Sequence, residues 1–269
     1  MDTELLRQYL EFYRDLGIKT VYRPAKSAKG GAPPAETAAA PACELPPVAP
    51  VGELPPVAPA GELPHAAATG ELPPAAATGE SLSQILSDIG DCRRCPLHEQ
   101  RSKIVFGVGN ERSPLVFVGE GPGADEDAQG IPFVGRAGQL LTQMIEGTAK
   151  REGIPLLRAD IYICNVVKCR PPGNRTPEPD EMEICGQFLF RQLMSIRPKA
   201  ICALGGTAAR ALTGHKEGVT KMRGKWFTWR DIPVMVTYHP SYLLRPYNQA
   251  TAKREAWEDL KKVLHFVYD

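Results

Sequence analysis

The stretch LVFVGEGPGADED, residues 115–127, decides how the rest of the chain is interpreted. Its apolar start is typical of a strand buried in a parallel sheet, and it runs directly into glycines at positions 119, 121 and 123. Glycine-rich turns after such strands often bind phosphate. The two commonest phosphate motifs are excluded here, because Ala124 stands where a dinucleotide fingerprint needs its third glycine and the chain contains no G-x-x-x-x-G-K-[ST] sequence.

The same turn is strongly acidic. Carboxylates lie at Glu120, Asp125, Glu126 and Asp127, and they would repel a phosphate group. A carboxylate can instead orient a water molecule and stabilise a developing positive charge nearby. The turn therefore predicts a site for a neutral ligand together with an activated water.

Further strands and helices alternate downstream of this turn. Short β-branched runs predict buried strands at 161–167, 200–204 and 234–238. Apolar residues at helical spacing predict helices at 138–145, 182–196 and 256–267. Strand, helix and strand in succession imply right-handed crossovers. We therefore predict an α/β fold, a three-layer α/β/α sandwich around a central, mainly parallel four-stranded sheet.

Polar residues and glycines follow several of the predicted strands. Asn165, the Gly205–Gly206 pair and His239 all lie at strand ends. Sheets of this kind bind their ligands outside the carboxyl ends of the strands. We expect these residues to share one cleft with the glycine turn.

The composition divides the chain into three parts. Apolar residues at helical spacing predict an amphipathic helix within residues 1–23. Residues 24–80 contain four nine-residue repeats such as GELPPVAPA, which offer one Leu and up to three Pro each and cannot bury a core. We predict a disordered Pro/Ala-rich linker there, with a ligand for a peptide-recognition domain as the alternative. Residues 81–269 have the composition of a globular domain.

Charge and cysteine content narrow the cellular setting. Residues 81–269 carry 26 Lys and Arg against 21 Asp and Glu, which tolerates an anionic partner. No apolar run reaches the roughly 18 residues that a membrane span needs, and the start MDTE lacks the basic residues of a secretory signal. Seven cysteines, an odd number, fit a reducing compartment better than a disulfide framework. We expect a cytoplasmic protein that does not bind membranes.

Four cysteines have the spacing of a metal site. Cys92 and Cys95 form a C-x-x-C pair, which by itself fits a redox dithiol, half a zinc site or half an iron–sulfur site. Cys169 lies on a Pro- and Gly-rich loop and Cys185 on the helix that follows, so both can converge on the pair. Four thiolates suit tetrahedral zinc or a [4Fe–4S] cluster, and the spacing does not choose between them. The other cysteines are expected in strands or in the linker: Cys43, Cys164 and Cys202.

Several uncommon motifs occur in order along the globular part. They are GEGPGADED, GIPFVGRAG, NVVKCRPPGNRTPEPDE, ALGGTAARAL and YHPSYLLR. With the four-cysteine spacing, they resemble the family 4, iron–sulfur, uracil-DNA glycosylases over nearly all of residues 82–267. The resemblance implies a uracil-DNA glycosylase-like fold, a chiefly structural [4Fe–4S] cluster on the four cysteines, and hydrolysis of the N-glycosidic bond of deoxyuridine in base excision repair. Such an enzyme flips the nucleotide out of single- or double-stranded DNA, here as a monomer.

The resemblance also assigns roles in a uracil pocket. Phe133 would stack on uracil, Asn165 would bond O4 and N3–H, and His239 would donate to O2 as the base leaves. An Asn that reads one base edge is worth roughly 1–3 kcal/mol of discrimination. Related glycosylases position the attacking water with an Asp. This chain has Gly121 at that place, so another side chain would have to position the water. The resemblance favours Glu126, which would also crowd uracil C5 and so exclude the methyl group of thymine; Glu120 is another candidate and Asn174 a secondary one.

A second group would bind the DNA itself. Backbone N–H groups of Gly206 and Thr207 and the hydroxyl of Ser241 would bind phosphates, and Arg245 would add positive charge. A further set, in the stretch SYLLR, would wedge into the gap left by the flipped base: Leu243 and Leu244, beside Tyr242.

Two other classes of function remain to be compared. A metal-stabilised protein could bind uracil-containing DNA without cutting it. One group of relatives traps DNA through an inserted His-containing loop, and that insertion is absent between Lys168 and Thr176. An iron–sulfur oxidoreductase with a nucleotide cofactor is inconsistent with the glycine spacing.

Overall fold

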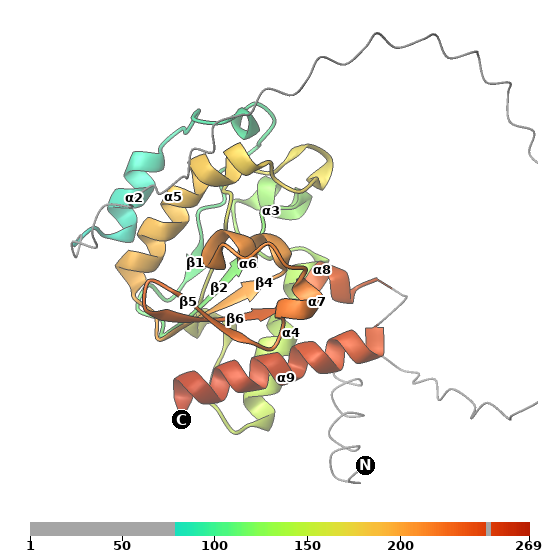
Figure 1. Ribbon diagram of the computed structural model, residues 1–269. Coiled ribbons are helices and arrows are strands. Elements are labelled where there is room, and N and C mark those ends of the chain that lie inside the picture. The colour runs from blue at the N-terminus through green and yellow to red at the C-terminus, as the bar shows by residue number, and fades with distance from the viewer. Residues whose placement is uncertain (1–78, 246–248) are drawn as a thin grey trace, which may run out of the picture. The chain divides into compact units, whose positions relative to one another are not determined.

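A six-stranded sheet lies at the centre of the computed structural model, which describes residues 79–245 and 249–269 (Figure 1). The strand order is β1-β3-β2-β4-β6-β5. The strands are β1 (Val108–Gly109), β2 (Leu115–Gly119), β3 (Tyr162–Asn165), β4 (Ala200–Leu204), β5 (Trp226–Trp229) and β6 (Ile232–Thr237). The four central strands run parallel, and β1 and β5 pair antiparallel at the two edges.

Helices connect the strands and cover both faces of the sheet (Figure 1). The α-helices are α2 (Leu82–Ile89), α3 (Ala124–Gln129), α4 (Arg136–Arg151), α5 (Pro179–Ile196), α6 (Gly206–Thr213), α7 (Val219–Met222), α8 (Pro240–Leu243) and α9 (Gln249–Tyr268). Three short 3-10 helices lie in the loops: η1 (Pro96–His98), η2 (Arg158–Asp160) and η3 (Pro172–Asn174). The helices predicted at 138–145, 182–196 and 256–267 lie within α4, α5 and α9.

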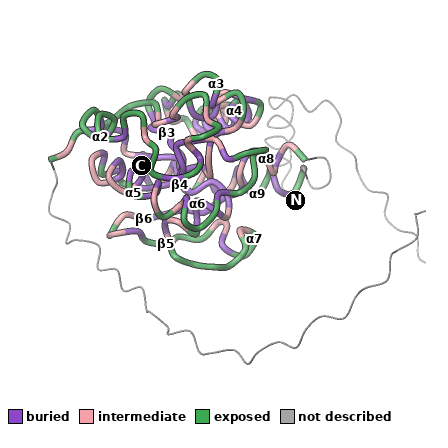
Figure 2. The backbone as a smooth tube through the Cα atoms, turned by 90° about the horizontal axis from the view of Figure 1, so that it is seen from above, coloured by how far each residue is buried: buried purple, intermediate pink, exposed green. Residues whose placement is uncertain are grey.

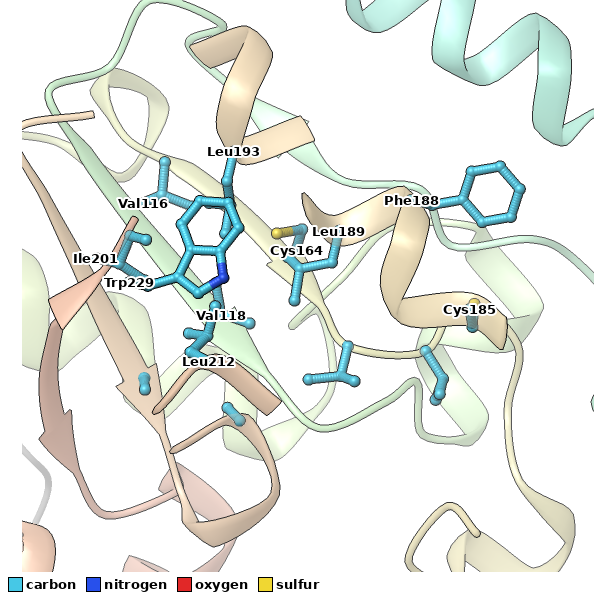
Figure 3. Packing of buried hydrophobic residues seen from close by; sticks show 14 of the residues in the cluster. Val116, Val118, Cys164, Cys185, Phe188, Leu189, Leu193, Ile201, Leu212 and Trp229 are labelled. Carbon is cyan, nitrogen blue, oxygen red and sulfur yellow. The ribbon is translucent and has the colours of Figure 1, made fainter. Parts of the chain in front are cut away.

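The sheet is apolar on both faces because alternate residues of a strand point to opposite sides. In β2, Val116 and Val118 belong to a core packed by α2, α5 and α6, whereas Leu115 and Phe117 belong to a second core packed by α4 and α9. Figure 3 shows the first core, where Trp229 packs near the valines of β2. Figure 2 shows that buried positions concentrate along the strands and the inward helix faces. The predicted three-layer α/β/α sandwich is confirmed.

The sheet has six strands where the sequence predicted four. The four predicted strands are the parallel ones, and the two additional strands are the antiparallel edges. Strand β1 is two residues long, too short to leave a periodic pattern. Strand β5 joins β6 through Arg230 and Asp231, which both have positive φ, 46° and 69°. Positive φ at both positions is the type I′ hairpin geometry, but Arg-Asp lacks the Asn-Gly signature that would have predicted it.

Two predictions lie outside the described residues. They are the amphipathic helix in residues 1–23 and nearly all of the linker in residues 24–80. Within the described parts of the chain, no helix is both long enough and apolar enough to cross a membrane.

Candidate active site and metal centre

A pocket of about 460 Å³ opens at the carboxyl ends of the parallel strands. Its size falls in the range of small-molecule sites, roughly 300–1,000 Å³. All the predicted catalytic and uracil-binding residues line it: Glu120, Gly121, Glu126, Phe133, Asn165, Asn174 and His239. The cleft expected from the strand ends is therefore present, and it gathers residues that lie far apart in the sequence.

Asn165 ends β3 and lies opposite Gly119 in the parallel register of β2 and β3. Its side chain is 1% exposed, and its Oδ1 atom has no hydrogen-bond partner. A buried polar atom without a partner costs about 1–3 kcal/mol. The residue itself lines the pocket, so a ligand that reaches this amide and donates a hydrogen bond would satisfy the atom.

Gly119 makes room for the polar and aromatic walls of the pocket. A Cβ at this position would lie 2.4 Å from Oδ1 of Asn165 and 2.6 Å from the ring of Phe133. Phe133 itself has a positive φ of 54°, a rare conformation for a bulky residue. The turn that carries Phe133 lies so close to α4 that a Cβ at Gly138 would be 1.9 Å from the carbonyl oxygen of Phe133. Both glycines are therefore required by close approach to the same aromatic residue.

His239 follows β6 and precedes α8. Its Nδ1 atom accepts a hydrogen bond from the backbone N–H of Ser241 at 3.2 Å and lies 2.8 Å from the Ser241 hydroxyl. Because Nδ1 accepts, the neutral ring carries its proton on Nε2. Burial lowers the pKa of His239 to about 4. The pocket therefore contains a neutral imidazole whose Nε2–H is available to a ligand.

Glu120 lies in the pocket beside Asn165. One of its carboxylate oxygens, Oε2, accepts a hydrogen bond from the hydroxyl of Thr207. Thr207 is 3% exposed, so this bond fixes the carboxylate from the inner side. Asn174, across the pocket, has a positive φ of 56° and accepts a bond from Nε of Arg170 at 2.7 Å.

Glu126 has a different environment from Glu120. Its carboxylate accepts three backbone hydrogen bonds, from Gly123, Val134 and Gly135, each at 3.1 Å. The first of these caps the start of α3, and the other two hold the segment that follows Phe133. Glu126 therefore joins the glycine turn to the turn that carries the pocket's aromatic wall.

The predicted DNA-binding residues divide between the surface and the core. Gly206, Ser241 and Arg245 line the pocket. Thr207 is buried with its hydroxyl on Glu120. Leu243 is fully buried in the core that contains α4 and α9. The structure thus leaves Leu244, which is partly exposed, as the better placed of the two wedge candidates.

The four predicted metal ligands all line a second, smaller pocket. Cys92, Cys95, Cys169 and Cys185 line it with apolar neighbours such as Phe188. Figure 3 shows two of these residues, Cys185 and Phe188, on α5. All four are free thiols. Across the described residues, no three His, Cys, Asp or Glu side chains are grouped closely enough to mark a metal-ion site.

The chemistry of this donor set fits a metal–thiolate group. Sγ of Cys185 accepts a hydrogen bond from the backbone N–H of Lys168 at 3.2 Å, and Sγ of Cys169 accepts one from Nη1 of Arg101 at 3.6 Å. Donors of this kind stabilise thiolate sulfur. Burial raises the pKa of Cys169 to about 12 and that of Cys185 to about 11, so both are neutral thiols until a metal replaces their protons.

Sequence reasoning missed two residues near these sites. Lys168 is 1% exposed between the pocket and the cysteines, although a lysine usually indicates a surface position. Arg175 lines the active-site pocket and pairs with Glu181 at 2.7 Å. The apolar run directly before Lys168 could have indicated that this lysine is buried. The acidic residues at the start of the helix after Arg175 could have indicated its ion pair.

The fold and the pocket define a member of the uracil-DNA glycosylase superfamily: residues 106–261 match the family model described as "Uracil DNA glycosylase superfamily". The type-4 uracil-DNA glycosylase of Thermotoga maritima is 47% identical over 191 residues, which is 70% of this chain and 96% of that protein. Those of Archaeoglobus fulgidus and Saccharolobus solfataricus are 44% and 41% identical, each over 68% of this chain and over 92% and 85% of their own lengths. This chain belongs to the type-4 uracil-DNA glycosylase family.

Proposed function

We propose that the protein removes uracil from DNA by hydrolysing the N-glycosidic bond of deoxyuridine, which leaves an abasic site for base excision repair. Family membership supports the reaction. The observation that carries its assignment to this pocket is the unpaired, buried Oδ1 of Asn165 beside the aromatic ring of Phe133. A flat base with an N–H group on its edge satisfies both features.

Recognition begins when the nucleotide leaves the helix, since the target bond cannot be reached inside the base stack. The uracil ring stacks on Phe133. Oδ1 of Asn165 accepts N3–H, and the amide of the same side chain donates to O4. Cytosine presents an acceptor at N3 and a donor at C4, so it opposes both bonds and is rejected.

Bond cleavage leaves negative charge on the departing base. His239 donates its Nε2–H to uracil O2, where this charge accumulates. One donor of this kind is commonly worth about 3–4 kcal/mol in the transition state. A neutral histidine gives this bond without carrying a charge into the ground-state pocket, which agrees with its lowered pKa.

A water molecule then attacks the sugar carbon. Glu120 is the best supported carboxylate for orienting this water, because its second oxygen is not engaged by Thr207. Asn174 is a further candidate at the pocket wall. Glu126 lines the pocket too, and its three backbone bonds suggest that it contributes by holding the pocket together.

The four cysteines would hold a [4Fe–4S] cluster. The cluster would supply a rigid cross-link between the loop after α2, the loop that carries Cys169, and α5. Zinc is the alternative for the same donors. Anaerobically purified protein should show the visible absorption of an iron–sulfur cluster, and colourless protein with bound zinc would contradict the cluster.

The DNA would lie across the mouth of the pocket. Backbone N–H groups at the start of α6, from Gly206 onward, would bind phosphate, and Arg245 would add positive charge at the rim. We expect a monomer that accepts uracil in single and double strands.

One assay tests the reaction. Purified protein is incubated with a uracil-containing oligonucleotide and then with alkali, which breaks the strand at abasic sites. Strand scission and free uracil are expected, and the same oligonucleotide with thymine should stay intact. A stable complex without scission would favour a uracil-binding protein that does not cut DNA.

A further inference from the structure

A buried lysine lies between the cysteine pocket and the uracil pocket. Lys168 is 1% exposed, and no carboxylate forms an ion pair with it in the described parts of the chain. Its Nζ donates to the backbone carbonyl of Asn165 at 2.7 Å and to Oε1 of Gln192 at 2.6 Å. A buried ammonium needs compensation, and both of these acceptors are neutral.

With metal bound, the cysteine pocket would supply the missing negative charge. Lys168 lines that pocket together with all four cysteines. Its backbone N–H donates to Sγ of Cys185 at 3.2 Å. When the cysteines bind metal they do so as thiolates, and the charge of Lys168 favours the thiolate of Cys185. A neutral side chain of the same length would leave this charge uncompensated.

The same residue is fixed firmly from the opposite side. Gln192 is fully buried, and its Nε2 donates to the carbonyl of Phe106 at 3.0 Å and to the hydroxyl of Tyr162 at 3.1 Å. Gln192 is therefore oriented with its oxygen toward Lys168. Tyr162 begins β3, the strand that Asn165 ends, so the network braces both ends of that strand.

We propose that Lys168 is a positioning residue that couples the metal site to the uracil pocket. Its main chain is anchored on a metal ligand, and its ammonium holds the carbonyl of Asn165, whose side chain carries the unpaired acceptor in the pocket. A rigid metal site would therefore fix the position of Asn165 through the side chain of Lys168. The inference rests on the proposed function, because Asn165 is the uracil ligand there.

Three substitutions separate this role from general stability. Lys168→Met removes the charge and the donors but keeps the length. Gln192→Met removes one acceptor and leaves the bond to Asn165. Lys150→Met is the matched control, because Lys150 is exposed in the last turn of α4. Each protein is purified anaerobically with its metal, and its visible absorption and melting temperature are recorded.

The first measurement is the affinity for free uracil. We expect Lys168→Met to weaken it about tenfold or more, since a lost bond from a charged donor has about that effect. The loss should appear in KM more than in kcat, with metal content retained. Gln192→Met should weaken uracil binding less, and Lys150→Met should match the wild type.

The second measurement tests the coupling itself. Linkage is reciprocal, so uracil should slow the loss of visible absorption when an iron chelator is added to the wild type. This protection should persist in Lys150→Met and disappear in Lys168→Met at uracil concentrations that saturate both proteins.

Each result decides a separate claim. Wild-type uracil affinity in metal-loaded Lys168→Met would overturn the positioning role, and full uracil protection in that variant would overturn the coupling. If Lys168→Met does not fold, Gln192→Met decides both points: uracil affinity and uracil protection equal to those of the wild type would overturn the proposal, because the acceptor that helps to hold the ammonium would then be dispensable. A wild type that neither binds uracil nor cleaves DNA would overturn the proposed function, and this inference with it.

Discussion

The ring of Phe133 lies 5.6 Å from the imidazole of His239, centroid to centroid, at an interplanar angle of 35°. The two residues are 106 positions apart in the sequence, one in the turn before α4 and one between β6 and α8. Both rings line the same pocket, and Asn165 lines it too. The proposed stacking surface and the proposed leaving-group donor are thus held at one fixed separation.

Replacing Phe133 should weaken uracil binding. Stacking of a base on an aromatic side chain is worth about 1–3 kcal/mol by alanine substitution. We expect Phe133→Ala to raise KM about tenfold or more in a uracil-release assay. Phe266→Ala is the control, because Phe266 is 52% exposed on α9. Equal losses in the two variants would show that the effect is not stacking.

The protonation state of His239 should not limit the reaction near neutral pH. Its pKa of about 4 keeps the ring neutral in the folded protein. We expect the cleavage rate to show no titration of this residue between about pH 5 and pH 8. His239→Gln should slow cleavage about 100-fold or more by loss of the donor. An inflection near the ordinary histidine pKa of 6.5 that disappears in His239→Gln would contradict this assignment.

The same lowered pKa predicts a change of stability with pH. The unfolded chain takes up a proton at the ordinary value of 6.5, whereas the folded protein does so only at about 4. Between these values the unfolded state binds more protons, so the free energy of unfolding falls as the pH falls through that window. His239→Gln should lose less stability than the wild type over this range, measured by denaturant titration at several pH values.

The two pocket glutamates should behave differently when truncated. Hydrogen bonds to a charged group contribute about 1.5–3 kcal/mol, and Glu126 accepts three from the backbone. Glu126→Ala should therefore lower both the melting temperature and the rate of uracil release. Glu120→Ala should lower the single-turnover rate with a smaller change in melting temperature. If Glu126→Ala released uracil at the wild-type single-turnover rate, Glu126 would have no part in catalysis.

Two Gly→Ala substitutions should act in opposite directions. At Gly119 the added Cβ would lie 2.4 Å from Oδ1 of Asn165, so Gly119→Ala should abolish uracil binding. At Gly147, inside α4, the added Cβ meets nothing within 4 Å. Gly147→Ala should stabilise the protein by about 0.5–1 kcal/mol at wild-type activity. Melting temperature and uracil affinity measured on both variants check the pair.

The sequence predicted the parts of the site that follow from strand direction. Asn165 ends a parallel strand and His239 closely follows another, and the carboxyl ends of such strands meet at one edge of the sheet. The roles of Thr207 and Leu243 could not be predicted in this way. Each lies in a short helix, of eight and four residues, where too few turns exist to show which face is buried.

Loop conformation limited the rest of the prediction. The three bonds to Glu126 depend on how the glycine turn meets the Phe133 turn, and that turn requires a positive φ at a phenylalanine. Sequence pattern does not encode such a conformation, since bulky residues rarely adopt it. Lys168 was missed for a related reason: its burial depends on a carbonyl at the end of β3 and on an amide and a sulfur from α5.

The wedge prediction can now be made for one residue. Leu243 is fully buried, so it cannot enter DNA without leaving the core, whereas Leu244 is partly exposed beside Arg245 at the pocket rim. A wedge fills the gap in a duplex after the base has flipped, and a single strand has no such gap to fill. Leu244→Ala should therefore reduce kcat/KM on duplex substrate far more than on single strands. Leu157→Ala, at a leucine that is 61% exposed on the loop after α4, should change neither rate. Equal losses of Leu244→Ala on both substrates would reject the wedge and point to a role in shaping the pocket.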